Sequence, residues 1–275
     1  MSKIGDSLKK SYDSIKNKVP FTPEVGLVLG SGLGSILDNL KVEATISYSE
    51  IENFPHSTAP GHKGQFLFVH IGEVPCVLMQ GRVHYYEGYD MTDVVKPVRL
   101  MALMGVKKVI LTNAAGGLQK GMLPGDIMMI TDHISQFVPS PLRGENYEEK
   151  GPRFPDMTNV YSLKLQEKAE ILAKQVSLDL KKGVYVQFSG PQFETPTEIK
   201  MCSLLGASAC GMSTVVEAVA LRHMGVEVMG FSMITNMAAG LNDAPLDETD
   251  VIEIAARRGK VFASFIEQLI KEIGQ

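Results

Sequence analysis

Seven short apolar segments, separated by segments of helical periodicity, constrain this chain more than any other feature. The apolar segments are rich in Val, Ile and Met and are apolar on both faces, as strands inside a covered sheet are. We expect strands at 25–29, 66–71, 75–79, 108–112, 127–131, 183–188 and 226–234, and helices at about 4–19, 92–105, 158–175, 196–205, 214–224 and 249–273. The alternation predicts a single α/β domain over residues 1–275, with a mixed or parallel central sheet flanked by helices.

The composition excludes several classes of protein. The chain has 275 residues, of which 44% are hydrophobic and 21% charged, as in ordinary globular proteins. A net charge of −4 argues against a general surface for nucleic acid or membrane. No apolar run reaches the roughly 20 residues of a membrane span, and the N-terminus lacks the apolar core of a signal peptide. Three cysteines without CxxC spacing predict reduced core thiols of a cytoplasmic protein, not a disulfide framework or a metal site.

A glycine-rich turn, GSGLG at 30–34, follows the first predicted strand. Such turns bring backbone amides close to phosphate. The turn does not complete a dinucleotide-binding pattern, because no acidic residue closes a second strand about 20 residues later. It is not a Walker A motif either, because no lysine follows it. Taken alone, it leaves two interpretations open: phosphate binding, or a tight turn without a ligand.

Polar residues follow other predicted strands. Arg82 and His84 come two residues apart after the strand at 75–79, and a guanidinium with an imidazole suits a phosphate dianion. Ser213 precedes a helix for which Thr214 and Glu217 form a predicted capping box, and amides at a helix start attract anions. Taken singly, a surface salt bridge for Arg82 and a purely structural role for His84 stay open. Together these residues favour an anion site, because ligands collect at strand ends in open α/β sheets.

A second capping box is predicted at the start of the helix at 196–205. Thr195 is its expected N-cap, Pro196 its first residue, and Glu198 the partner of Thr195. Glu194 stands just outside this helix and has no capping role, so it is available for another one.

Eight segments together resemble one family. They are GSGLG, GHKG, GRVHYYEGY, TNAAGG, GDIMMITDHI, GPQFETPTE, GMSTVVEAVALRHMG and SMITN. In this order and spacing, from about residue 22 onward, they are similar to the trimeric purine nucleoside phosphorylases. The resemblance implies one α/β domain with a twisted mixed sheet, and a homotrimer. It implies phosphorolysis of purine ribonucleosides and 2′-deoxyribonucleosides, as in purine salvage, with free base and (deoxy)ribose 1-phosphate as products. Inorganic phosphate would be a cosubstrate, and neither a metal nor a cofactor would be used.

The resemblance also implies a role for individual residues. Glu194, Asn236 and His84 would be catalytic. Phosphate would be bound by Ser31, His62, Arg82, His84, Ser213 and the backbone amide of Ala114. The nucleoside would be bound by Tyr86 and Met212 at the ribose, Glu194 and Asn236 at the base, Tyr185 and Phe193 nearby, and Phe154 from a neighbouring subunit.

Asn236, Glu248 and Met237 bear on substrate choice. Asn236 can donate to N7 and meet a 6-oxo group, so with Glu194 it favours inosine and guanosine over adenosine. An aspartate there would suit the 6-amino purine of methylthioadenosine phosphorylases. Glu248 stands where many family members have a histidine, and it could accept from a 5′-hydroxyl or simply cap the last helix. Met237 stands where some members have lysine.

Three rival functions remain to be tested. A methylthioadenosine phosphorylase would need an acidic residue at the base and an apolar 5′ pocket, against Asn236 and Glu248. A nicotinamide-dependent oxidoreductase rests on the glycine turn alone. A nucleoside-binding protein without catalysis would need no phosphate site.

Overall fold

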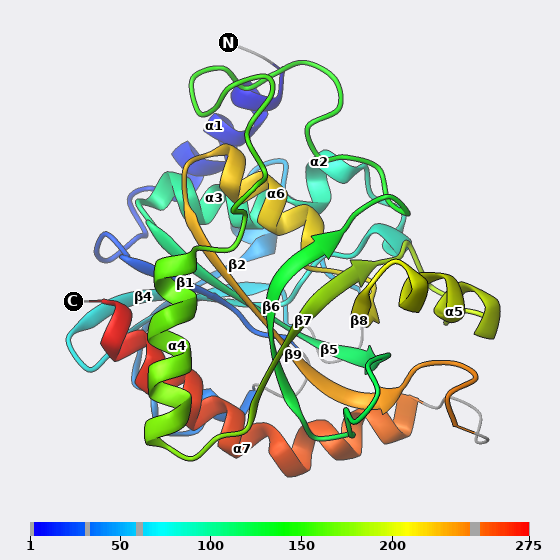
Figure 1. Cartoon of the computed structure of the whole chain (residues 1–275). Coiled ribbons are helices and arrows are strands. Elements are labelled where there is room, and N and C mark those ends of the chain that lie inside the picture. Colours follow the sequence, from blue (N-terminus) through cyan, green and yellow to red (C-terminus); the bar gives the residue numbers. More distant parts are fainter. Residues whose placement is uncertain (1–2, 31–33, 59–62, 243–247, 275) are drawn as a thin grey trace.

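The structure is a computed structural model that describes residues 3–30, 34–58, 63–242 and 248–274. Within these ranges, nine strands form one sheet in the order β2-β3-β4-β1-β5-β8-β7-β6-β9 (Figure 1). The strands are β1 (Val25–Val28), β2 (Val42–Ser47), β3 (Gln65–Ile71), β4 (Val74–Gln80), β5 (Lys108–Gly117), β6 (Ile127–Ile134), β7 (Leu180–Gln187), β8 (Ala207–Gly211) and β9 (Glu227–Met237). The helices are α1 (Lys3–Ile15), α2 (Met91–Val94), α3 (Lys96–Met104), α4 (Leu163–Gln175), α5 (Pro196–Leu204), α6 (Val215–His223) and α7 (Glu248–Ile273).

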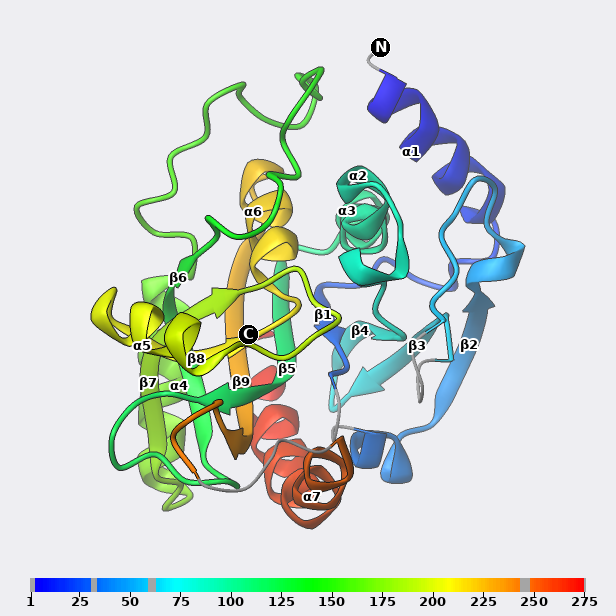
Figure 2. The same cartoon turned by 90° about the vertical axis from the view of Figure 1, so that its right-hand side faces the viewer.

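The sheet is mixed, as the sequence predicts. β1 runs parallel to β4 and β5, whereas β3 is antiparallel to both of its neighbours, β2 and β4. β5 also pairs in parallel with β9 and antiparallel with β8. β9 also pairs with β6, β6 with β7, and β7 with β8. Because both β8 and β9 pair with β5, these strands form a closed ring of pairings that makes up about half of the sheet. The remaining strands extend from β1 as an open, twisted wing (Figure 2).

Helices cover both faces of the sheet, which explains strands that are apolar on both sides. α1, α3 and α6 lie on one face, and α4 and α7 on the other (Figures 1 and 2). Most buried strand side chains divide between two large clusters: Leu27 faces the cluster under α4 and α7, and its neighbour Val28 faces the other. On β9, the ring of Phe231 meets that of Phe265 on α7 edge to face, with centroids 5.7 Å apart. No described helix is long and apolar enough to cross a membrane.

One glycine allows two strands to approach closely beside the site. A methyl group at Gly30, just after β1, would lie 2.4 Å from the carbonyl oxygen of Thr112 on β5. The Gly30 amide donates to Thr112 Oγ1 over 2.9 Å. Further along, the pairing of β5 with β9 shifts register between Ala115 and Gly116, and such bulges often redirect side chains at active sites. The ends of β1, β5, β8 and β9 therefore meet in one region.

The sequence prediction differs from the structure at several boundaries. It missed β2 and β8: β2 is a largely exposed edge strand, and β8 is built from small residues. The segment 108–112 continues as a strand to Gly117. The helix expected from 158 begins at Leu163, because Ser162 caps it and Tyr161 makes a bridge to Val228. The helix expected at 92–105 is two helices, and the first helix ends at Ile15 rather than at Pro20.

Candidate functional site

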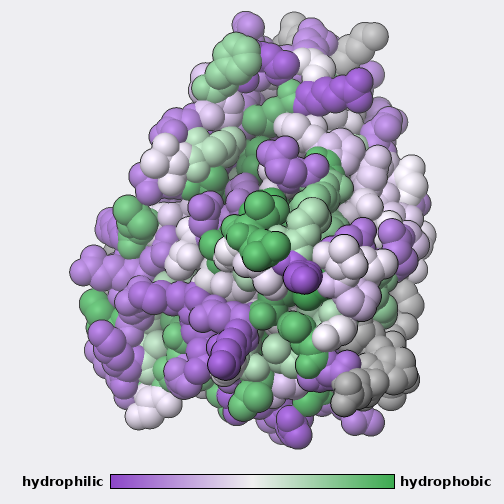
Figure 3. Space-filling model, turned by 45° about the vertical axis from the view of Figure 1, so that its right-hand side comes forward, coloured by the Kyte–Doolittle hydropathy of each residue, from purple (hydrophilic) through white to green (hydrophobic). Residues whose placement is uncertain are grey.

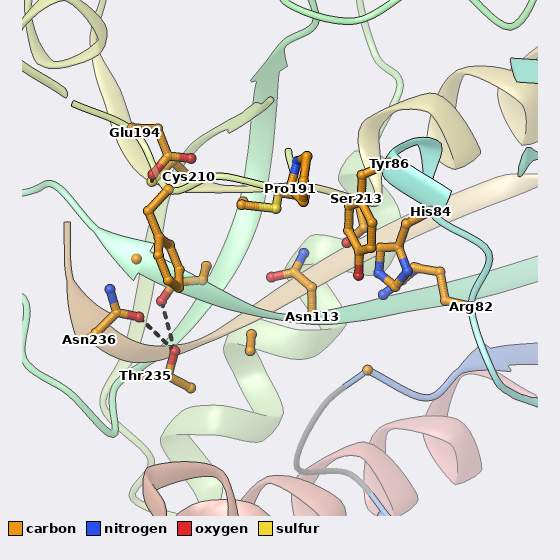
Figure 4. Close-up of a pocket in the computed structure, with 17 residues that line it drawn as sticks. Arg82, His84, Tyr86, Asn113, Pro191, Glu194, Cys210, Ser213, Thr235 and Asn236 are labelled. Carbon is orange, nitrogen blue, oxygen red and sulfur yellow. Dashed lines mark hydrogen bonds between the residues drawn. The ribbon is translucent and has the colours of Figure 1, made fainter. Parts of the chain in front are cut away.

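A cavity of about 370 Å³ opens where these strands end (Figure 4). Its volume falls within the range of small-molecule sites. Its polar side chains form two groups, with Glu194 and Asn236 at one end and Arg82, His84 and Ser213 at the other. Asn113 on β5 lies between the two groups.

Arg82 belongs to a buried ion pair and not to a surface salt bridge. Its side chain is 3% exposed, and that of Glu217 on α6 is 1% exposed. The guanidinium donates to Glu217 through Nε (3.0 Å) and Nη2 (2.9 Å), and through Nη1 to the carbonyl of Thr112 (2.8 Å). These three bonds fix the plane of the guanidinium at the cavity wall. The prediction that Glu217 caps α6 is therefore wrong, because its carboxylate is committed to Arg82.

His84 is oriented by Glu87, a residue that the sequence analysis did not single out. Glu87 Oε1 accepts the backbone N–H of His84 (2.6 Å) and lies 3.2 Å from His84 Nδ1. Burial acts to raise the pKa of Glu87, but hydrogen bonds from His84 and Thr58 outweigh it and lower that pKa to about 2. A carboxylate that is ionised at neutral pH favours a proton on Nδ1, which directs Nε2 away from Glu87. The imidazole stacks on the ring of Tyr86, with centroids 4.8 Å apart.

Ser213 is presented by a strained turn. Thr214 has φ +83° and ψ −51°, and the amide of Val215 donates to the carbonyl of Ser213 (3.0 Å), which closes a γ-turn. A β-branched residue at positive φ costs about 1–3 kcal/mol, and such strain gathers at functional sites. Thr214 Oγ1 accepts from Asn113 Nδ2 (2.8 Å) instead of capping α6. The turn leaves Ser213 at the cavity wall, directly before α6.

Glu194 is the acidic group at the other end. It is 8% exposed, and burial raises its pKa above the usual value. It lies just before α5, where the predicted capping box is confirmed: Glu198 N donates to Thr195 Oγ1 (3.3 Å) and Thr195 N donates to Glu198 Oε2 (2.7 Å). The box fixes the chain that carries Glu194 without using its carboxylate.

Asn236 on β9 is held by its neighbours in sequence. Thr235 Oγ1 donates to Asn236 Oδ1 (3.0 Å; Figure 4). Asn236 Nδ2 donates to the carbonyl of Met237 (3.2 Å). Because the amide NH₂ has two hydrogens, one of them remains for a ligand after the bond to Met237. The site can thus offer a hydrogen-bond donor and a carboxylate acceptor to one flat polar molecule.

The other predicted site residues divide into three sets. Ala114, Tyr86, Phe193 and Met212 line the cavity. Tyr185 does not line it: the residue is fully buried behind Gly211, where an added methyl group would lie 2.4 Å from its hydroxyl. Phe154 is 88% exposed and also does not line this cavity. Ser31, His62 and the side chain of Glu248 lie outside the part that the structure describes; Glu248 itself begins α7.

Cys210 is a buried free thiol, as the sequence predicts, and it also lines the cavity. Burial, and then the nearby Glu194, raise the pKa of its thiol well above the ordinary value, so the thiol is not a nucleophile at neutral pH. Within the described residues, no group of three or more His, Cys, Asp or Glu side chains is arranged to hold a metal ion.

Known proteins with the same fold and similar sequence include enzymes. The family model of the phosphorylase superfamily matches residues 24–271. Purine nucleoside phosphorylase 1 of Geobacillus stearothermophilus is 43% identical over 269 residues, which cover 98% of this chain and 98% of that protein. A purine nucleoside phosphorylase of Schistosoma mansoni solved with inosine has a TM-score of 0.91 at 35% identity, covering 96% of this chain and 95% of that one. The Schistosoma mansoni structure solved with adenosine has a TM-score of 0.90 at 36% identity, covering 96% of both chains.

Proposed function

The chain belongs to the phosphorylase superfamily, and from this we propose that it cleaves purine nucleosides with inorganic phosphate. The products are the free base and (deoxy)ribose 1-phosphate. One observation carries the proposal: a single cavity has a carboxylate and an amide at one end and an arginine, a histidine and a serine at the other. The first pair suits a purine, and the second group suits a phosphate dianion.

The phosphate end supplies the nucleophile. Arg82, His84 and Ser213, joined by the amide of Ala114 and by Ser31 and His62, hold phosphate below C1′ of the ribose. Fixing the dianion there replaces its hydration by oriented donors, so little reorganisation is left for the reaction. The anion also stabilises the positive charge that develops on the sugar as the C1′–N9 bond stretches.

The base end stabilises the leaving group. Negative charge develops on the purine as the bond breaks. The free N–H of Asn236 donates to N7, and Glu194 accepts from the N1–H side. Contacts that are stronger in the transition state than in the bound substrate accelerate the reaction. Contacts of equal strength in the two would not. Tyr86 and Met212 face the ribose, Tyr185 and Phe193 pack nearby, and Glu248 serves the 5′ end. The reaction uses neither a metal nor a cofactor, and we expect it in the cytoplasm.

Base release tests this function directly. Inosine, guanosine, adenosine and methylthioadenosine are incubated with and without phosphate, and free base is measured by chromatography. We expect hypoxanthine and guanine only when phosphate is present. Release without phosphate would indicate a hydrolase, and no release from any nucleoside would leave a binding protein.

Replacing Asn236 by aspartate should change the preferred base. A carboxylate repels a 6-oxo group and accepts from a 6-amino group, so kcat/KM should fall for inosine and rise for adenosine. We expect the ratio of the two to change by about 100-fold or more, since a mismatched hydrogen bond in a buried site has effects of this size. The control is Asn146→Asp, which should leave the ratio unchanged. Asn146 lies in the loop before α4, and its side-chain amide bonds to His223. An unaltered ratio in Asn236→Asp would refute the assignment of Asn236 to the base.

We further propose that the active form is a homotrimer in which Phe154 of one subunit covers the ribose in the next. Phe154 is largely exposed in its own subunit, and other apolar side chains are exposed at and near α5, notably Phe193, Leu204 and Leu205. Apolar side chains also gather in the middle of the face shown in Figure 3. Clusters of this kind mark interaction surfaces.

Phe154→Ala should raise KM for inosine roughly tenfold or more, because a buried aromatic contact is lost in the assembled site. The melting temperature should change little, because the side chain is 88% exposed in its own chain. Leu163→Ala, at an exposed leucine on α4, should alter neither quantity. Mixing Phe154→Ala with the inactive Glu194→Gln under exchange should restore activity, because mixed trimers contain some intact sites. Failure of the mixture to regain activity would count against shared sites.

A further inference from the structure

Cys210 lies between the two residues assigned to the base. Its Sγ lies 3.5 Å from Glu194 Oε2 (Figure 4). On its other side is Gly116 of β5, where a methyl group would lie 3.3 Å from Cys210 Sγ and 3.3 Å from Asn236 Nδ2. The thiol is thus a fixed part of the wall between Glu194 and Asn236.

The thiol is a hydrogen-bond donor in this setting. Since its pKa is raised well above the ordinary value, the sulfur keeps its proton at neutral pH. The S–H bond is directed to Glu194, and among the described residues Cys210 is the side chain that bonds to this carboxylate, beside the backbone N–H of Glu194 itself. Glu194 is 8% exposed, and burial without a hydrogen-bond donor would favour its neutral acid form. A donor such as the thiol therefore helps the carboxylate to stay ionised.

We propose that Cys210 is a positioning residue for Glu194: its S–H bond holds Oε2 and leaves Oε1 directed at the N1 edge of the purine. The inference rests on the proposed function for the identity of the ligand, but the Cys210–Glu194 bond itself does not. A thiol suits this task because it is a weak donor. It restrains the carboxylate and helps to keep it ionised, while most of the accepting capacity remains for the base.

The surroundings of Glu194 supply an internal control. The titratable groups that face it are Cys210 on β8, and Cys202 and Glu198 on α5. Cys202 is fully buried in the same small apolar cluster as Cys210, but it does not line the cavity. A change at Cys202 therefore disturbs the same packing without removing a bond to Glu194.

The test measures the titration of Glu194 itself. Carboxyl ¹³C resonances are followed against pH in the wild type, Cys210→Ser, Cys210→Val and Cys202→Ala, and Glu194→Gln identifies the signal. Serine is a stronger donor and should lower the pKa of Glu194, whereas valine donates nothing and should raise it by about half a pH unit or more. Cys202→Ala should leave it unchanged. If valine does not fit, Cys210→Ala provides the variant without a donor.

Activity provides the second readout. The acidic limb of kcat/KM for inosine should move to higher pH in Cys210→Val and to lower pH in Cys210→Ser, because Glu194 must be ionised to accept from the base. Shifts of the same sign in both variants, or an equal shift in Cys202→Ala, would overturn the proposal. A wild type that cleaves no nucleoside would refute the proposed function instead, and the ¹³C titration would still decide whether the bond exists.

Discussion

Replacing Glu194 by glutamine should lower kcat/KM for inosine by about two to three orders of magnitude. The side chain keeps its shape, but it loses the negative charge that accepts from the N1–H side of the base. A site built to bond a substrate group discriminates strongly when the match is lost, and the loss has effects of this size. Initial rates at saturating phosphate, over a range of inosine concentrations, measure the change.

Stability should respond in the opposite direction. Because burial raises the pKa of Glu194 above its value in the unfolded chain, ionisation of this group opposes folding. Its contribution to stability is therefore greatest at low pH and is lost as the pH rises through the folded pKa. Glu194→Gln removes this dependence, so near neutral pH the variant should be at least as stable as the wild type. A variant that loses activity but not stability identifies a residue that is retained for function.

Glu198→Gln is the matched control. This carboxylate lies four residues further on, is exposed, and is used in the capping box with Thr195. We expect only a small change in unfolding free energy, because glutamine at this position can also complete the capping box, and nearly unchanged kcat/KM. If both variants lost activity equally, the helix start and not the Glu194 carboxylate would be responsible.

The fold was predictable where burial determines the pattern. Strands covered on both faces, such as β1 and β9, must be apolar throughout, and their segments stand out in the sequence. β8 did not stand out, because its residues are small enough for Glu194 and α5 to pack beside them. β2 did not stand out either, because an exposed edge strand needs little apolar surface. Closure of half of the sheet around β5 depends on pairings between distant strands, which no local pattern reports.

The site was predictable where residues follow strand ends and was missed where partners are distant. Arg82 and His84 were identified from their position after β4. Glu217 was misassigned because its spacing from Thr214 fits a capping box, whereas its true partner, Arg82, is 135 residues away. The capping-box spacing was misleading because leaving a buried guanidinium without a countercharge costs more free energy than leaving a helix without a side-chain cap. Glu87 was missed because it stands three positions after His84 in a short polar segment that suggests only a turn.

Glu217→Gln should destabilise the protein by about 3 kcal/mol, because it leaves the buried charge of Arg82 without its partner. Glutamine can keep one hydrogen bond to the guanidinium, so the loss reports mainly the countercharge. The measurement is unfolding by denaturant in a buffer without phosphate. Asp179→Asn is the control: it removes a carboxylate that is 82% exposed from its ion pair with Lys181, and we expect almost no change.

Inorganic phosphate should restore part of the stability lost in Glu217→Gln. A ligand that binds only the folded state stabilises it by an amount that rises with the logarithm of its concentration relative to Kd. A dianion beside Arg82 also supplies the missing negative charge. The rise in melting temperature caused by phosphate should therefore be larger in Glu217→Gln than in the wild type or in Asp179→Asn. An equal rise in all three proteins would mean that phosphate does not bind next to Arg82. A larger rise in Glu217→Gln would show that the Glu217 carboxylate and phosphate compete for the positive charge of Arg82. Glu217 would then hold Arg82 in place and also limit how strongly Arg82 binds phosphate. Weaker binding of phosphate favours release of the phosphorylated sugar.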